Sequence, residues 1–221
     1  MTHHPKTQSA SIRVHLRLFF CLFVTATFAR AADAPPTVDD ARFAEAERLI
    51  HAAIDEGHMP GAVLLVGKGD AIVYRKAFGH RSIEPVKAAM TTDTIFDLAS
   101  VTKPIAGATS VMVLVDRGKV KVTDRVADHL PDFGANGKDE ITVEQLLLHQ
   151  SGLTPDNHLR DYGDGPGKAV ARLLALKPTW TPGSRFKYSD VGYMVLGELV
   201  RAVDGRPLDL FARDEVFAPL G

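Results

Sequence analysis

Hydrophobic residues recur with two different periods along this 221-residue chain, first in a helix and a hairpin and then in a long helical run. Between Phe43 and Ile54 the apolar positions follow helical spacing. Asp39 or Asp40 can cap this segment, and Gly57 is suited to end it. The pattern therefore predicts one amphipathic helix ahead of the first strands.

Two apolar runs separated by a short polar turn predict a β-hairpin. The runs cover 61–67 and 71–79, and Lys68-Gly69-Asp70 between them is typical of a turn. Because this glycine-containing turn joins two strands rather than a strand and a helix, a phosphate-binding loop is not indicated. A two-stranded hairpin is marginally stable alone. We therefore expect the sheet to be incomplete in this chain.

The remainder of the chain returns to helical spacing. Thr142 to Gln145 has the pattern of a capping box, and Pro104 falls in a first turn, where no intrahelical N–H partner is lost. The pattern predicts an α/β (α+β) fold, with an antiparallel sheet flanked by helices plus an all-helical region. The predicted helices of this part are 100–116, 143–149, 168–176, 191–203 and 207–216.

The first 31 residues have the features of a secretory signal peptide. A basic, acid-free start is followed by twelve apolar residues from Leu18 to Ala29, too few to span a bilayer comfortably. Ala29-Arg30-Ala31 then supplies a small-x-small cleavage pattern. We expect residues 1–31 to be removed and 32–221 to form a secreted or periplasmic domain without a membrane span. An uncleaved N-terminal anchor is the alternative.

Composition excludes several classes of function for the mature domain. Cys21 is the only cysteine and would leave with the signal, so neither disulfides nor thiolate chemistry is expected. Removing the four basic residues of the signal leaves 22 Lys and Arg against 27 Asp and Glu, a net charge of −5. Because no basic run is present, nucleic acid is not an expected partner. The nine histidines lack compact metal-binding spacing, so neither a metal nor an organic cofactor is expected.

Ser100 and Lys103 carry the clearest candidate chemistry. Three residues apart at the start of a helix, they place a hydroxyl and an amine on one face. A neutral amine in hydrogen-bond reach can take the hydroxyl proton and make the serine a nucleophile. A serine and a lysine at this spacing occur by chance in many proteins, so other sequence motifs are needed to support a catalytic role. A Ser-His-Asp hydrolase of the α/β type would need G-x-S-x-G, which the chain lacks.

Tyr188 is the second candidate, in Tyr188-Ser189-Asp190 between the Pro182-Gly183 turn and a predicted helix. A phenol near a lysine ammonium can have a lowered pKa and act as a general acid or base. The alternative is a half-buried structural tyrosine with a satisfied hydroxyl. His149 follows a capped helix and is interpreted as a structural histidine rather than a catalytic imidazole.

The chain resembles the serine hydrolase superfamily of class C β-lactamases, D-alanyl-D-alanine carboxypeptidases and related esterases. The ordered set of motifs is more specific than any one of them and extends over most of the mature chain. The matching stretches are Phe96-Asp97-Leu98-Ala99-Ser100-Val101-Thr102-Lys103, Leu146-Leu147-Leu148-His149-Gln150-Ser151-Gly152-Leu153, Pro182-Gly183, Phe186-Lys187-Tyr188-Ser189-Asp190-Val191-Gly192-Tyr193 and Pro219-Leu220-Gly221.

This resemblance implies a set of catalytic roles and a class of substrates. Ser100 would be the acylated nucleophile and would supply an oxyanion donor from its backbone N–H, while Lys103 and Tyr188 would share proton transfer. Which of the two is the general base stays open; Lys103 would need a lowered pKa to act as one. The substrate would be an ester, an amide, a peptidoglycan-type peptide or a β-lactam. Asp190 would contact it, where the family pattern usually has asparagine. A carboxylate accepts but cannot donate, which favours an esterase or peptidase over a β-lactamase.

One expected motif is missing. The family's third motif, a Lys- or His-containing tripeptide ending in glycine, has no match between Val191 and Gly221. We therefore expect a C-terminally truncated chain that lacks this motif and later strands, and low activity in the 221-residue form. The alternative function is a truncated non-catalytic remnant, or a penicillin-binding-like protein without turnover. The sequence does not define an oligomeric state.

Overall fold

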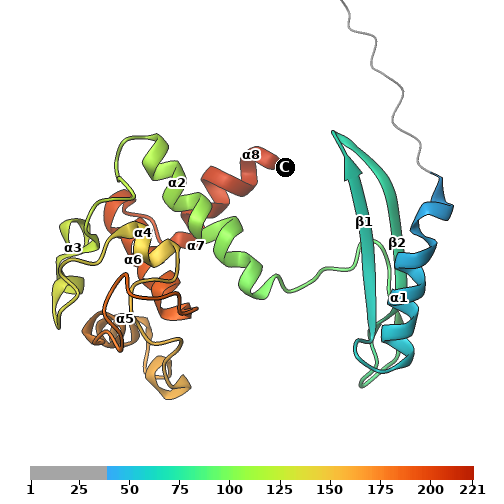
Figure 1. The fold of residues 1–221 in the computed structure, drawn as a ribbon, viewed down its shortest axis with the longest axis horizontal. Helices are drawn as coiled ribbons and strands as arrows, with labels where there is room; N and C mark the ends of the chain where they lie inside the picture. Colours follow the sequence, from blue (N-terminus) through green and yellow to red (C-terminus); the bar gives the residue numbers. More distant parts are fainter. Residues whose placement is uncertain (1–38) are drawn as a thin grey trace, which may run out of the picture. The chain divides into compact units, whose positions relative to one another are not determined.

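The computed structural model describes residues 39–221, in two compact units that divide between Thr94 and Ile95 (Figure 1). We describe each unit by itself. The predicted signal peptide, residues 1–31, lies outside the described residues. Of the helices in the described part, none combines the length and hydrophobicity that a bilayer crossing requires.

The first unit is a helix and a three-stranded antiparallel sheet with strand order β1-β2-β3 (Figure 1). The Asp39 carboxylate accepts a hydrogen bond from the Ala41 N–H and caps the first turn. The predicted helix and hairpin are confirmed, whereas the two-residue strand β3 was not predicted. The elements are η1 (Asp40–Phe43), α1 (Ala44–Asp55), β1 (Gly61–Lys68), β2 (Ala71–Ser82) and β3 (Ala88–Ala89).

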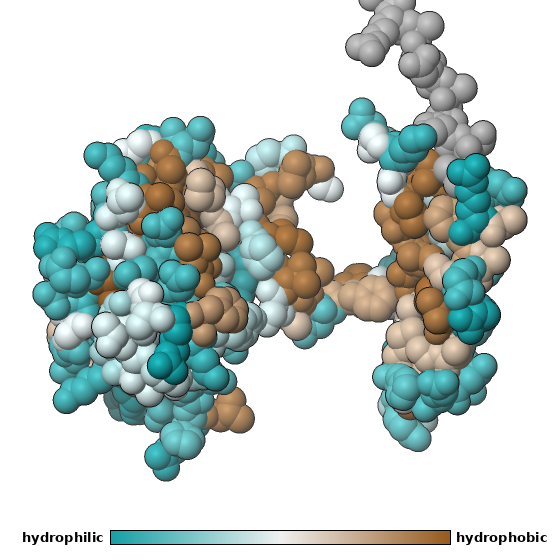
Figure 2. Space-filling view, in the orientation of Figure 1, coloured by the Kyte–Doolittle hydropathy of each residue, from teal (hydrophilic) through white to brown (hydrophobic). Residues whose placement is uncertain are grey.

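Aromatic contacts join β2 to α1 and to the end of the preceding turn η1. The rings of Phe43 and Tyr74 lie 4.2 Å apart, and His51 meets Phe78 edge to face at 5.4 Å. Tyr74 and Phe78 are buried, and burial of such side chains is worth about 1.5–3 kcal/mol each. Figure 2 shows hydrophobic residues gathered over the strands of this unit. Tyr74 and Phe78, which lie on the same face of β2, thus form a small core beside α1 and η1.

The second unit is helical, as predicted. Within residues 95–221, β-type backbone pairing is limited to one isolated antiparallel bridge between Arg125 and Thr142. The capping box is present, because the Thr142 side chain accepts from the Gln145 N–H and the Gln145 side chain accepts from the Thr142 N–H. The elements are η2 (Ala99–Val101), η3 (Lys103–Ala108), α2 (Thr109–Asp116), α3 (Val126–His129), η4 (Pro131–Gly134), α4 (Val143–Leu147), η5 (Leu159–Tyr162), α5 (Pro166–Ala175), α6 (Asp190–Asp204), α7 (Leu208–Ala212), η6 (Arg213–Phe217) and α8 (Ala218–Leu220).

Helix α6 is the centre of the core of this unit. It contacts α2, α3, α4, α5 and α7. The Ser189 hydroxyl accepts a hydrogen bond from the Gly192 N–H at 3.0 Å and caps its start, and Gly205 ends it in the left-handed conformation. Because helices pack against α6 on several sides, the position of its first turn, which begins at Asp190, is fixed as well. Its fully buried apolar residues are Val191, Val195, Leu196, Leu199 and Val200.

The helix predicted over 100–116 is continuous in the structure, but it consists of three segments of different helix type. A 3₁₀ turn, η2, leads into the π-helical segment η3, and a regular α-helix, α2, follows. Pro104 has no N–H to donate within the first turns, and the Thr109 hydroxyl donates to the Pro104 carbonyl at 2.9 Å. The predicted final helix is likewise divided, into α7 and the π-helical η6. π-helical turns are frequent at functional sites.

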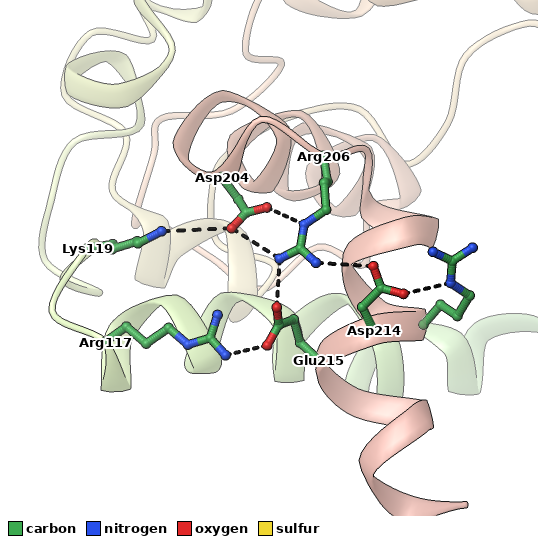
Figure 3. Close-up of polar contacts among 7 residues, drawn as sticks. Arg117, Lys119, Asp204, Arg206, Asp214 and Glu215 are labelled. Atoms are coloured by element: carbon green, nitrogen blue, oxygen red, sulfur yellow. Dashed lines mark hydrogen bonds and ion pairs between the residues drawn. The ribbon is translucent and has the colours of Figure 1, made fainter.

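An ion-pair network joins the C-terminal ends of α2 and α6 to η6 (Figure 3). Arg206 is its centre, with Nε 2.7 Å from Asp204 and Nη2 2.7 Å from Glu215. Glu215 also pairs with Arg117, which directly follows α2. The Asp204 side chain is only 8% exposed, so its charge depends on these partners.

Lys138 is a fully buried lysine beside the C-terminal end of α5. Its ammonium donates to the Ala135 carbonyl at 2.6 Å and to the Leu176 carbonyl, and Nζ lies 5.3 Å from the centre of the Phe133 ring. Burial lowers the pKa of Lys138. The Lys138 side chain therefore caps the C-terminal end of α5, because it donates a hydrogen bond to the carbonyl of Leu176, the residue that follows the helix.

Candidate active site

Ser100 lies on an exposed 3₁₀ turn whose backbone is strained just before it. Ala99 has φ +43°, a conformation that residues other than glycine rarely adopt. The Asp97 carboxylate accepts a hydrogen bond from the Ala99 N–H at 2.8 Å and supports this conformation. Strain of this kind clusters at functional sites because it fixes a side chain in an unusual direction.

Lys103 lies one turn after Ser100 and contacts it directly. Its Nζ donates to the Ser100 Oγ at 3.1 Å, and the same Nζ forms an ion pair with Asp190 Oδ1 at 2.6 Å. This pair gives the buried Oδ1 atom of Asp190 its partner. The structure therefore brings together three of the four residues that the sequence selected, from the start of the η2–η3 stretch and the first turn of α6.

The lysine is held in its charged form. Burial lowers the pKa of Lys103, but hydrogen bonding to Asp190 and Tyr188 outweighs it and raises the pKa above the usual value of 10.5. The lowered pKa that a lysine base requires is therefore not what the geometry produces. The physical reason is Asp190, a carboxylate where an asparagine would carry no charge.

Tyr188 completes the cluster. The Lys103 Nζ lies 4.9 Å from the centre of the Tyr188 ring. Interaction with Lys103 and then with Ser100 lowers the pKa of the Tyr188 phenol, against the opposing effects of burial and Asp190. The side chain is 42% exposed, so the phenol is accessible from solvent. A phenol with a lowered pKa beside a lysine ammonium has the chemistry of a general base.

A segment that sequence reasoning did not connect to the site holds the Tyr188 loop in place. Residues 149–155 accept hydrogen bonds from the loop that leads into α6. Hydrogen bonds run from the Gly183 N–H to the Gln150 carbonyl (2.8 Å), from the Lys187 N–H to the His149 carbonyl (2.8 Å), from the Ser189 N–H to His149 Nδ1 (3.0 Å), from the Ser189 hydroxyl to the Thr154 carbonyl (2.7 Å) and from the Asp190 N–H to the Pro155 carbonyl (2.8 Å).

Gly152 permits this close approach. It has φ +75°, and a Cβ there would lie 2.1 Å from the Trp180 carbonyl oxygen. Its own carbonyl accepts from the Thr179 and Trp180 N–H groups. In the sequence, the Ser151-Gly152 pair after a capped helix predicts that the helix ends there. It does not predict that Gly152 contacts Thr179 and Trp180.

A pocket opens beside Lys103 and Asp190. It encloses about 730 Å³, within the range of small-molecule sites. Its walls are largely apolar, with Leu173, Met194 and Leu208 among them, and Glu198 adds a carboxylate. Within residues 39–221, no three His, Cys, Asp or Glu side chains are grouped so that they could hold a metal ion.

Comparisons with known proteins identify the family of the chain. Residues 46–221 match the family model described as Beta-lactamase. A protein of Escherichia coli K12 named "Putative D-alanyl-D-alanine carboxypeptidase" is 33% identical over 201 residues, covering 81% of this chain and 46% of that protein. An N-acetylmuramyl-L-alanine amidase of Bacillus subtilis 168 is 36% identical over 180 residues, covering 73% of this chain and 41% of the amidase.

Solved structures show the same fold. A family VIII carboxylesterase aligns with a TM-score of 0.68 and 30% identity, covering 85% of this chain and 51% of the esterase. The chain thus spans about half the length, or less, of the relatives it matches. The family model covers most of the sequence and includes every residue of the Ser100 cluster. The chain belongs to the beta-lactamase family.

Proposed function

We propose that the protein is a serine hydrolase that acts through an acyl-enzyme at Ser100 on an ester, an amide or a β-lactam. The observation that carries the proposal is the contact of the Ser100 hydroxyl with Lys103, itself paired with Asp190 and close to Tyr188. The carboxypeptidase, amidase and esterase names of similar proteins support hydrolysis of an acyl bond. No cofactor is required, because side chains and water supply the chemistry.

The charges of the cluster favour Tyr188 as the general base. The Tyr188 phenolate takes the Ser100 proton, and Lys103 stays an ammonium that stabilises the phenolate. The freed Oγ attacks the acyl carbon and forms a tetrahedral intermediate. Tyr188 returns its proton to the leaving oxygen or nitrogen as the acyl bond breaks. Water, deprotonated in turn by Tyr188, releases the acid from Ser100 and restores the hydroxyl.

Asp190 has two roles in this proposal. Its Oδ1 fixes Lys103 and keeps it charged. Its carboxylate also accepts a hydrogen bond from an N–H or O–H group of the substrate, a contact that suits peptides better than groups with acceptors alone. A peptidoglycan-type peptide fits this preference and the secreted or periplasmic location that residues 1–31 predict.

A second candidate is a penicillin-binding-like protein or remnant that binds or is acylated without turnover. The observation that favours it is again the Lys103–Asp190 pair. If a neutral lysine were the required base, Asp190 would suppress activation by holding the proton on Lys103. The two candidates differ in turnover, not in the residues of the cluster.

The test combines covalent labelling with turnover. The full chain is incubated with a fluorescent penicillin and, separately, with a p-nitrophenyl ester, and compared with Ser100→Ala. Ser184→Ala, in an exposed loop, is the control variant. Labelling and turnover that are lost only in Ser100→Ala support the hydrolase. Ser100-dependent labelling without turnover favours the second candidate. Activity that persists in Ser100→Ala, or its absence in the parent, contradicts the hydrolase proposal.

A further inference from the structure

We infer that His149 is a positioning residue for Tyr188: it holds the backbone on both sides of the tyrosine and packs against its ring. The consequence for catalysis rests on the proposed function of Tyr188. The positioning itself does not, because it concerns only where the phenol lies relative to Lys103. His149 comes from the turn after α4, about forty residues before Tyr188 in the sequence.

The first support is a pair of hydrogen bonds that bracket Tyr188. The His149 carbonyl accepts from the Lys187 N–H at 2.8 Å, and His149 Nδ1 accepts from the Ser189 N–H at 3.0 Å. One residue therefore satisfies the backbone donors immediately before and after the tyrosine. A lost acceptor would leave a part-buried N–H unpaired, which costs about 1–3 kcal/mol.

The second support is the contact between the rings. The His149 and Tyr188 rings lie 4.5 Å apart, tilted by 33°. His149 is itself held by Tyr193 at 5.1 Å and by the edge of Phe186 at 5.7 Å. The Tyr193 hydroxyl donates to the Leu147 carbonyl and so anchors this support to the end of α4. A tyrosine that is 42% exposed would otherwise be free to change rotamer.

The third support is the backbone conformation of His149. Its φ is +56°, in the left-handed region that costs a residue with a side chain about 1–2 kcal/mol. This conformation lets one residue present its carbonyl and its side chain to the same loop. The backbone strain at His149 is compensated by the hydrogen bonds that this conformation allows with Lys187 and Ser189.

The charge state of the imidazole fits this role. Burial and then the neighbouring Lys103 lower the pKa of His149, with Asp190 and the Ser189 N–H opposing them. A neutral imidazole has one acceptor nitrogen, and here that acceptor is Nδ1. Protonation would turn Nδ1 into a donor facing the Ser189 N–H and would place a second positive charge near Lys103.

Two variants separate the acceptor from the ring. His149→Phe keeps an aromatic ring but has no acceptor. His149→Asn loses the ring, but its Oδ1 takes the place of Nδ1, and asparagine tolerates a positive φ. His129→Phe and His129→Asn are matched controls, because His129 is part-buried in the same unit and pairs with Asp124. If His149→Phe does not fold, His149→Ala, which also lacks an acceptor, replaces it.

The first measurement does not depend on enzyme activity. The chain has four tyrosines, so the titration of Tyr188 is obtained from tyrosinate absorbance by subtracting the Tyr188→Phe curve. We expect His149→Phe to raise the pKa of Tyr188 toward its ordinary value, because the phenol no longer stays beside Lys103. His149→Asn, which keeps the acceptor but loses the ring contact, should raise that pKa less, and both His129 variants should leave it where it is in the parent.

The second measurement is ester hydrolysis. A catalytic group displaced by about 1 Å can lose a factor on the order of 100 in rate. We expect at least a tenfold loss of kcat in His149→Phe with little change in KM, and recovery to within about threefold of the parent in His149→Asn. An unchanged Tyr188 titration in folded His149→Phe, or equal shifts in the His149 and His129 variants, would overturn the inference. A parent without turnover would contradict only the proposed function, since the titration still reports the position of Tyr188.

Discussion

Lys103 and Asp190 form an ion pair in which Nζ lies 2.6 Å from Oδ1, and the same Nζ donates to the Ser100 hydroxyl. The Lys103 side chain is only 16% exposed, so the carboxylate is a substantial part of its surroundings. An ammonium held in this way can stabilise an anion beside it but does not readily accept a proton. The pair therefore supports the proposal that Tyr188, and not Lys103, is the general base of the cluster.

The pH dependence of kcat/KM should follow from these two groups. Activity requires the Tyr188 phenolate, so it rises with pH on a limb centred below the ordinary tyrosine value of 10, because the pKa of Tyr188 is lowered. It also requires the Lys103 ammonium, so it falls again only above 10.5, because the pKa of Lys103 is raised. The check is a pH–rate profile for ester hydrolysis. A single descending limb below pH 10 would contradict this assignment.

Asp190→Asn should move the descending limb to lower pH. The amide cannot supply the negative charge that raises the pKa of Lys103, so the lysine loses its proton earlier as pH rises. The ascending limb should also move to lower pH, because the Asp190 charge raises the pKa of Tyr188 and the amide does not, so the whole profile shifts to lower pH. Asp132→Asn, a carboxylate in η4 outside the cluster, is the control and should leave the profile unchanged. If Lys103 were the base, its deprotonation would give an ascending limb, so Asp190→Asn would move that limb to lower pH and no descending limb due to Lys103 would be present.

Sequence patterns predicted the hairpin and the longer helices and selected the four residues that lie together in the structure, but they predicted neither the charges of the cluster nor its supports. Helical spacing and the capping box located α6 and α4, and the four candidate residues came from short motifs. The raised pKa of Lys103 depends on a contact between residues 103 and 190. The role of His149 likewise depends on hydrogen bonds across forty residues. Periodicity reports neighbours along one element and carries no information about such distant partners.

Lys138→Met should destabilise the fold by about 1–3 kcal/mol, because it leaves the Ala135 and Leu176 carbonyls without their donor. The pH dependence should change as well. Because burial lowers the pKa of Lys138, the unfolded chain binds more protons between that lowered pKa and the unfolded value of about 10.4.

The free energy of unfolding of the parent should therefore rise with pH over that interval, and Lys138→Met should remove this rise. Urea unfolding at a series of alkaline pH values measures both effects. Lys177→Met, at an exposed position, is the control and should behave as the parent does. Equal slopes in the parent and Lys138→Met would show that the buried ammonium does not control this dependence.

Arg206→Met should lower the melting temperature by several degrees. The methionine retains part of the apolar packing over Phe211 but leaves the nearly buried Asp204 and its neighbour Glu215 without their shared partner. Thermal unfolding followed by circular dichroism measures the change. Arg201→Met is the matched control, because Arg201 lies on α6 and makes a single ion pair, with Glu198 at 3.0 Å. Similar losses in both variants would show that the network (Figure 3) acts no differently from a surface pair.

Gly152→Ala should destabilise the protein far more than Gly205→Ala, although both glycines have a positive φ. At Gly205 a Cβ would meet nothing within 4 Å, so the cost is the backbone strain alone, about 1–2 kcal/mol. At Gly152 the Cβ would lie 2.1 Å from the Trp180 carbonyl oxygen, so the two segments must also separate.

That separation would break the hydrogen bonds from Thr179 and Trp180 to Gly152 and loosen the segment that supports Tyr188. We expect Gly152→Ala to lose more than about 3 kcal/mol in urea unfolding. Any folded fraction should show a higher pKa for Tyr188, because the phenol is no longer held beside Lys103. Equal losses of stability in the two variants would mean that the close contact at Gly152 relaxes without cost.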